Sequence, residues 1–242
     1  MKIASFTFCL FFFQSLFSQP KNGNDLIEIM YKTYNKTWYK HFTFTQDAIF
    51  YKDGKPVKTE VWHEALSCPG KLIIKYDSIR SKNGVIFNNN TVTPVKEGVI
   101  GTPRPFIHDL LLVGFDVYFL EPKISTHLLD SLGYNLKIFR EDVFDNRKVY
   151  VVGASVGDST SHQFWIDKER LYLHKIVYGK QNKTMDVVFT DYKKMKGNWV
   201  ATRVVFKQNG ILQMEEKYYN INFPKSLQMD MFEPNHFLNA KW

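Results

Sequence analysis

The stretch that decides the fold is His162–Phe223, which reads HQFWIDKERLYLHKIVYGKQNKTMDVVFTDYKKMKGNWVATRVVFKQNGILQMEEKYYNINF. Apolar and polar residues alternate through most of it, as in Phe164 and Ile166, and this two-residue period is typical of half-buried strands. Between the alternating segments are short turns whose residues tolerate tight or left-handed backbone. These turns lie at Asp167–Arg170, Lys196–Asn198 and Gln208–Gly210. The stretch therefore predicts a meander of antiparallel strands that curves around apolar side chains.

The residues before this meander predict one helix followed by further strands. Asn24 is suited to cap a helix from Asp25 to about Lys40, whose apolar residues recur at helical spacing. From His41 the period changes to two, so a first strand is expected to run to about Phe50. Further strands are expected at 59–66, 71–76, 85–87, 135–143 and 148–154.

The alternation lapses between about Pro103 and Tyr134, where apolar residues again recur at helical spacing. Two helices are expected to interrupt the sheet there, with Gly133 closing the second. The predicted fold class is thus mainly β with α (α+β), formed by a single domain over residues 19–242, because a sheet-rich chain of this length needs no second core.

The amino terminus has the pattern of a secretory signal peptide at residues 1–18. An apolar run from Ile3 to Phe17 follows Lys2, is too short for a comfortable membrane span, and turns polar at Ser18. The sequence therefore predicts an exported protein that is soluble after cleavage. Cys68 would be its one cysteine, which leaves packing and strand pairing, without an internal disulfide, to stabilise the fold.

Charge and motifs narrow the classes of function. The formal net charge is +8, and the lysines are dispersed; with export, this balance argues against nucleic acid and fits transient contact with an anionic membrane surface. The sequence holds no HExxH motif and no cysteine pairs of a zinc site. No metal, cofactor or catalytic residue is predicted, and the protein is not expected to be an enzyme.

Several short motifs together give the chain a resemblance to a known family. They are Phe44-Thr45-Gln46, Gly54-Lys55-Pro56, Pro69-Gly70-Lys71-Leu72, Phe164-Trp165-Ile166-Asp167, Asp191-Tyr192, Gly197-Asn198-Trp199 and Phe232-Glu233-Pro234. In this order, after an amphipathic helix, they make the chain similar to the periplasmic outer membrane lipoprotein-sorting proteins, the LolA-like lipoprotein carriers.

The resemblance implies a half-open antiparallel barrel of roughly eleven strands, with helices that cover an apolar cavity for the acyl chains of lipoproteins. It also implies a periplasmic, soluble carrier whose partners are an acylated lipoprotein or lipid, an inner-membrane release complex and an outer-membrane acceptor. The family's functional cavity arginine is not carried over to any residue of this chain.

For such a cavity we predict an apolar lining and a movable helical lid over Phe106 to Phe119. The predicted lining is Phe42, Phe44, Trp62, Leu72, Ile74, Phe87, Phe164, Ile166, Phe189, Val204 and Phe206. The predicted lid residues are Phe106, Leu110, Leu111, Val113 and Val117. Two alternatives remain: a partner-binding module of the cell envelope would fill the barrel with side chains, and a hydrolase would bring polar groups together around His63 or His108.

Overall fold

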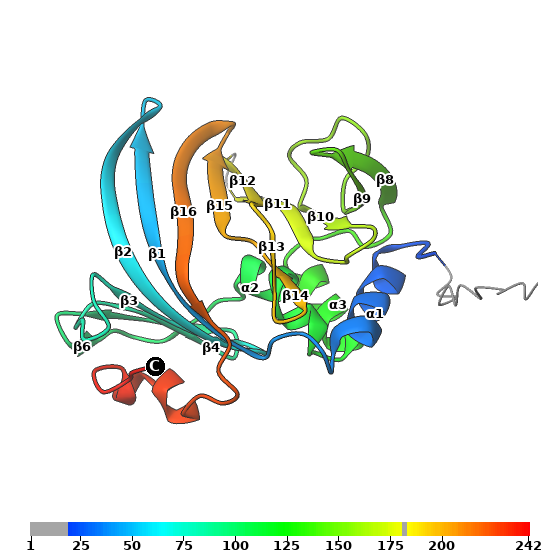
Figure 1. Ribbon diagram of the computed structural model, residues 1–242. Coiled ribbons are helices and arrows are strands. Elements are labelled where there is room, and N and C mark those ends of the chain that lie inside the picture. Colours follow the sequence, from blue (N-terminus) through cyan, green and yellow to red (C-terminus); the bar gives the residue numbers. More distant parts are fainter. Residues whose placement is uncertain (1–18, 181–182) are drawn as a thin grey trace, which may run out of the picture.

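The computed structural model describes residues 19–180 and 183–242, so the predicted signal peptide at 1–18 lies outside the described residues. One large antiparallel sheet dominates it (Figure 1). The first meander consists of β1 (His41–Lys52), β2 (Lys55–Ser67), β3 (Lys71–Tyr76), β4 (Gly84–Asn88), β5 (Thr91–Lys96) and β6 (Val99–Ile100). The second consists of β8 (Phe139–Phe144), β9 (Arg147–Val152), β10 (Gln163–Asp167), β11 (Leu173–Lys180), β12 (Lys183–Thr190), β15 (Arg203–Gln208) and β16 (Ile211–Asn222).

The two meanders become one sheet because β1 pairs with both β2 and β16. The strand order is β6-β5-β4-β3-β2-β1-β16-β15-β12-β11-β10-β9-β8, and the two ends do not meet. The predicted half-open α+β barrel is thus confirmed. The described sheet has 14 strands, more than the roughly eleven expected, because two-residue strands such as β6 and β7 (Arg104–Pro105) are too short to show an alternation.

The hairpin turns follow the sequence closely. Between β1 and β2, Asp53 and Gly54 both have positive φ (51° and 73°), as a tight hairpin turn requires. Asn209 and Gly210 do the same between β15 and β16, at 49° and 79°. The turn at Lys196–Asn198 joins β13 (Lys193–Met195) to β14 (Asn198–Val200), and this hairpin forms a separate two-stranded sheet.

The first helix, α1, spans Gly23–Tyr34 and differs from the prediction at both ends. Its N-cap is Asn22, whose side chain accepts a hydrogen bond from the Asp25 amide at 2.9 Å, so the prediction of Asn24 was wrong. A Cβ on Gly23 would lie 2.7 Å from a Val152 methyl, and this close approach explains why glycine begins the helix. The helix ends six residues before Lys40, which frees Trp38 to stack on Tyr118 at 4.3 Å between ring centroids.

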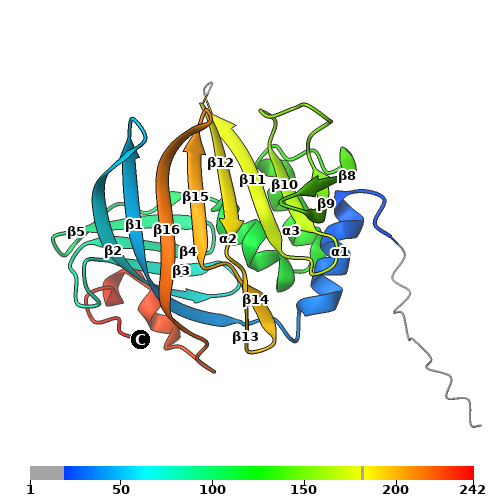
Figure 2. The ribbon, with the colours of Figure 1, turned by 45° about the horizontal axis from the view of Figure 1, so that its top comes forward.

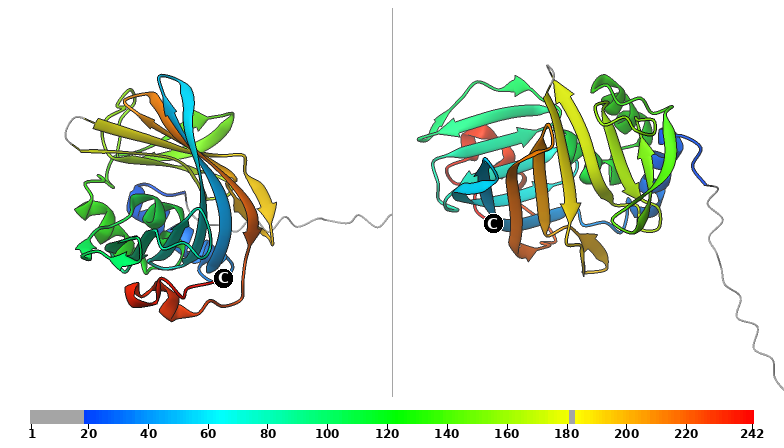
Figure 3. Two further views of the ribbon diagram at one scale, coloured as in Figure 1. Left: turned by 90° about the vertical axis from the view of Figure 1, so that its left-hand side faces the viewer. Right: turned by 90° about the horizontal axis from the view of Figure 1, so that it is seen from above.

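The other helices lie between the two meanders in sequence and on the concave side of the sheet in space (Figures 2 and 3). They are α2 (Asp109–Gly114), the 3-10 helix η1 (Asp116–Tyr118) and α3 (Pro122–Ser131). Together with α1, they pack a closed core against β9 to β12. Ile27, Val117 and Leu129 are fully buried in it, so this end of the concave face is filled.

A buried carboxylate holds the turn between β10 and β11. Asp167 is fully buried and accepts hydrogen bonds from the Arg147 guanidinium at 2.8 Å and from the Arg170 amide at 2.7 Å. His174 lies 3.3 Å from the same carboxylate. Burial alone would raise the pKa of Asp167, but these hydrogen bonds outweigh it and hold the pKa well below its usual range.

The helical layer is anchored to this same turn. Tyr34 of α1 donates its hydroxyl to the Arg170 carbonyl at 2.7 Å, and Tyr118 of η1 donates to the Leu171 carbonyl at 2.8 Å. The network around Asp167 therefore fixes the position of the helices as well as a hairpin.

The convex face of the first meander is covered by the C-terminal segment, with the 3-10 helices η2 (Met229–Phe232) and η3 (Pro234–His236). Phe232 and Phe237 are fully buried there. Lys75 of β3 is also fully buried and donates to the carbonyls of Ile79 at 3.1 Å and Ala240 at 2.9 Å. This part of the sheet is packed on its outer side, which leaves its inner side to form a site.

We predict that Asp167→Asn destabilises the fold by about 3 kcal/mol at pH 7, because it removes the buried carboxylate partner of Arg147 and leaves that guanidinium only the exposed Glu169. A carboxyl with a depressed pKa stabilises the fold above its unfolded pKa, and that stabilisation disappears as the pH falls. Urea unfolding at pH 7 and pH 3.5 should therefore show a large difference between wild type and variant at pH 7 and a smaller one at pH 3.5. A constant difference would contradict this role.

Candidate ligand-binding cavity

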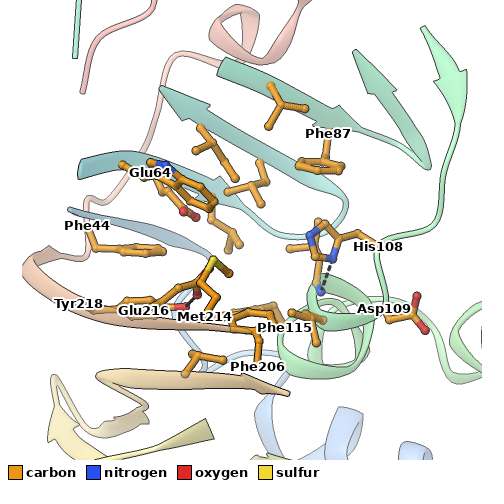
Figure 4. A pocket seen from close by; sticks show the side chains of 18 of the residues that line it. Phe44, Glu64, Phe87, His108, Asp109, Phe115, Phe206, Met214, Glu216 and Tyr218 are labelled. Carbon is orange, nitrogen blue, oxygen red and sulfur yellow. Dashed lines mark hydrogen bonds between the residues drawn. The ribbon is translucent and has the colours of Figure 1, made fainter. Parts of the chain in front are cut away.

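The inner face of β1 to β4, continued by β11, β12, β15 and β16, encloses a cavity of about 350 Å3. The segment that enters α2 covers it from the concave side (Figure 4). Most of its wall is apolar, and Phe106, which is 43% exposed, lies at its rim. The lining residues are Phe44, Trp62, Glu64, Leu66, Leu72, Ile74, Tyr76, Val85, Phe87, Phe106, His108, Asp109, Leu110, Leu111, Phe115, Tyr178, Phe189, Val204, Phe206, Met214, Glu216 and Tyr218.

Strand register explains how residues distant in sequence share this wall. Phe44 of β1 is opposite Glu64 of β2, and Leu72 of β3 is opposite Phe87 of β4. Across β16, Val204 of β15 is opposite Glu216. Residues with the same two-residue parity therefore face inward from every strand.

Eight of the eleven predicted lining residues border the cavity. They are Phe44, Trp62, Leu72, Ile74, Phe87, Phe189, Val204 and Phe206. Phe42 does not border the cavity; its ring packs against that of Phe44, with 4.7 Å between the ring centroids. Phe164 and Ile166 face the filled end of the sheet, where Phe164 packs against Tyr134 at 5.8 Å.

The predicted lid residues also fall into two groups, one that borders the cavity and one that is buried in the core. Phe106, Leu110 and Leu111 border the cavity, whereas Val113 and Val117 are fully buried in the core beneath α1. Phe115, four residues after Leu111, also lines the cavity and was missed. Its i, i+4 spacing from Leu111 was the available signal.

Sequence reasoning also missed two acidic residues in the cavity wall. Glu64 and Glu216 are only 6% and 9% exposed, and they project from β2 and β16 into the same space (Figure 4). Trp62 was expected to face inward, and strand parity places Glu64 on the same face.

Burial raises the pKa of both carboxyls. For Glu64, burial and then the nearby Glu216 raise the pKa well above its usual value. For Glu216, burial raises the pKa to about 7, although Tyr218 donates its hydroxyl to this carboxyl at 3.0 Å and lowers it. The cavity wall thus contains two carboxyls whose pKa values are raised, that of Glu216 to about 7.

His63 and His108 have different positions. His63 points to the convex side of the sheet, where its Nδ1 lies 3.4 Å from the Thr45 hydroxyl. His108 lines the cavity, and its Nδ1 accepts a hydrogen bond from the Leu111 amide at 3.4 Å at the start of α2. Burial lowers the pKa of His108 to about 4, so the ring is neutral at physiological pH. Its position is that of a helix cap.

We predict that Glu216→Gln makes the fold more stable at pH 8 by on the order of 3 kcal/mol, with a smaller effect at pH 5. A carboxyl whose pKa is raised on folding stabilises the protein below its unfolded pKa, and that stabilisation is lost as the pH rises through the folded value of about 7. Urea unfolding at pH 5 and pH 8 measures this. A variant less stable than wild type at pH 8 would contradict the assignment of Glu216 as a buried weak acid.

Comparisons with known proteins give a likeness in structure alone. No protein-family model and no curated protein matches the chain. A domain described as an outer membrane lipoprotein-sorting protein, from Vibrio parahaemolyticus, has a TM-score of 0.63 at 14% identity, covering 90% of this chain and 98% of that one.

Two further structures have a similar likeness. A DUF1329 family protein from Desulfovibrio piger has a TM-score of 0.57 at 15% identity, covering 87% of this chain and 95% of that one. A LolA superfamily protein from Nitrosomonas europaea has a TM-score of 0.57 at 11% identity, over 87% and 97% of the two chains. At these identities the comparisons show a shared fold, and the predicted LolA-like architecture is confirmed at that level. Among residues 19–180 and 183–242, no helix combines the length and the apolar character needed to cross a bilayer.

Proposed function

We propose that this chain is an exported carrier, formed by one domain over residues 19–242, that binds acyl chains of lipoproteins or lipids and moves them across the periplasm to the outer membrane. The observation that carries this proposal is the unfilled apolar cavity of about 350 Å3. Protein interiors normally close such space by packing, and ligand sites begin at about this volume.

The physical requirement of a carrier matches this cavity. An acyl chain gains about 0.8 kcal/mol per methylene by leaving water for the membrane, so a carrier has to offer comparable apolar surface. Phe44, Leu72, Phe87 and Phe206 supply such a surface. The shared fold with a domain described as lipoprotein-sorting supports the same function.

The alternatives fit less well. A partner-binding module would have its barrel filled, as the other end of this sheet is filled by α1, η1 and α3. The hydrolase alternative expected polar groups to converge around His63 or His108, but His63 points away from the cavity and His108 caps α2. The polar groups that do converge are Glu64 and Glu216, which we interpret below as a binding feature.

Cavity filling tests the proposal without adding a charge. Val85 borders the cavity, and Val85→Trp is expected to occupy much of its volume and to weaken binding of a fluorescent fatty-acyl probe by at least about tenfold, because the chain then loses its apolar contacts. The matched control is Val99→Trp, since Val99 is 70% exposed in β6 and does not line the cavity. Equal binding by wild type and both variants would contradict the proposal.

Charge substitutions in the wall provide a second comparison. Phe44→Glu and Phe206→Glu should abolish acyl binding, while His63→Ala should have little effect because His63 lies on the convex side. Normal binding by both glutamate variants would overturn the position of the site.

A carrier also has to meet a membrane surface, and two hairpin tips suit this contact. Val57 and Ile211 are 61% and 60% exposed at the tips of β1–β2 and β15–β16, which lie at the same end of the sheet (Figure 1). Lys55 and Lys58 lie close to Val57 in sequence, and Lys207 precedes Ile211 by four residues on the paired strand β15. The combination of an exposed apolar residue with lysines fits an anionic lipid surface.

We expect the protein to sediment with vesicles that contain anionic phospholipid, and high salt should release it. Val57→Asp with Ile211→Asp should abolish the sedimentation, whereas Val143→Asp, at a residue that is 63% exposed in the edge strand β8, should not. Equal sedimentation of all three proteins would contradict this docking surface.

A further inference from the structure

Gln46 lies on the same face of the sheet as the two cavity glutamates, close to Glu216. On β1 it is opposite Trp62 of β2 and Tyr218 of β16. Glu64 and Glu216 each lie two residues along from these partners, so all three polar side chains share the inner face. The cluster lies where the two meanders join.

The hydrogen-bonding capacity of this cluster is mostly unused. Gln46 is fully buried, and neither its amide nitrogen nor its amide oxygen has a hydrogen-bond partner in the described structure. Its amide lies near enough to Glu216 to lower the pKa of that carboxyl, without reaching hydrogen-bond geometry. Glu64 receives no hydrogen bond from the described residues, and Glu216 receives one, from Tyr218.

Such unpaired groups are rare in protein interiors, because each costs free energy that a hydrogen bond would offset. An apolar wall could have been completed with leucine or phenylalanine at these positions. Unpaired acceptors at the edge of an open cavity therefore point to a ligand that supplies donors.

The charged residues around the cavity indicate whether the ligand's polar group is positive or negative. The lining includes Glu64, Glu216 and Asp109 and has no lysine or arginine, although the whole chain carries a net charge of +8. Asp109 points away from the two glutamates in Figure 4, and Tyr134 donates a hydrogen bond to it at 2.7 Å. His108 is neutral at physiological pH. The cavity therefore has an acidic wall without a positive charge of its own.

We infer that Glu64, Glu216 and Gln46 bind a protonated amine on the acyl-bearing ligand, while its alkyl chain lies along the apolar wall. This inference rests on the proposed carrier function and adds a polar recognition group to it. A primary ammonium has three donors, which match the two carboxylates and the amide oxygen. It also neutralises the buried acids, whereas a carboxylate or phosphate at the same place would be repelled.

The test compares ligands that differ only in the head group. Decylamine, decanol and decanoate are titrated into the wild-type protein at pH 8, where Glu216 is mostly ionised and the amine remains protonated. We expect decylamine to bind at least about tenfold more tightly than decanol, and decanoate to bind more weakly than decanol. The net charge of the protein favours decanoate, so it cannot produce this order.

Isosteric variants then locate the recognition group. Glu64→Gln and Glu216→Gln should each reduce the preference for decylamine over decanol to about twofold or less. Both should still bind decanol, which shows that the cavity is intact. The matched control is Asp47→Asn, because Asp47 follows Gln46 on the other face of β1 and pairs with the Tyr219 hydroxyl at 3.2 Å. It removes one charge and should keep the full preference.

The possible outcomes test the amine site and the carrier function separately. If decanol binds and decylamine binds no better, the amine site is wrong and the carrier function stands. If none of the three ligands binds, the proposed function fails together with the inference. A preference for decylamine that survives both glutamine variants would overturn the assignment to Glu64 and Glu216.

Discussion

The pairing of β1 with β16 is the interaction on which the rest of the structure depends. It joins two meanders from opposite ends of the chain, and its register runs from Thr43 opposite Asn222 to Phe50 opposite Met214. Because of it, Phe44 stacks on Tyr218 at 4.3 Å, and Glu64 and Glu216 share one cavity. Neither meander alone would enclose this space, since each supplies only part of the wall.

The concave face then divides into a filled end and an open end. At the filled end, α1, η1 and α3 pack on β9 to β12 and are fixed by the hydrogen bonds of Tyr34 and Tyr118 to the turn that Asp167 stabilises. At the open end, the cover is the short helix α2 and the chain that enters it. The C-terminal segment supports this end from the convex side. The cavity persists because the sheet is supported from outside and only lightly covered from inside.

The sequence could predict the strands, most turns and the half-open barrel, because these depend on local alternation and turn residues. It could also place most of the lining, since parity along one strand fixes which residues share a face. It could not separate Phe164 and Ile166 from Val204 and Phe206, because both pairs have the same pattern and belong to the same core, and only the second pair also borders the cavity. The choice of Asn22 over Asn24 depended on the contact of Gly23 with Val152, which is equally non-local.

The acidic cluster shows a different limit. Glu64 follows from the parity of Trp62, but its meeting with Glu216 depends on strand pairing across 152 residues of sequence. A polar residue in an alternating strand is normally assigned to the solvent face. Here, the departure from that rule places two carboxyls in the cavity wall, where we propose that the amine of the ligand binds.

The carrier function is tested most directly by native mass spectrometry, with lipid extraction, of the mature protein purified gently from its own envelope fraction. We predict a co-purified acylated species that is absent from the Val85→Trp variant and present with Val99→Trp. A protein that remains empty, even when offered lipoprotein or phospholipid, would contradict the carrier function and favour a partner-binding module of the envelope.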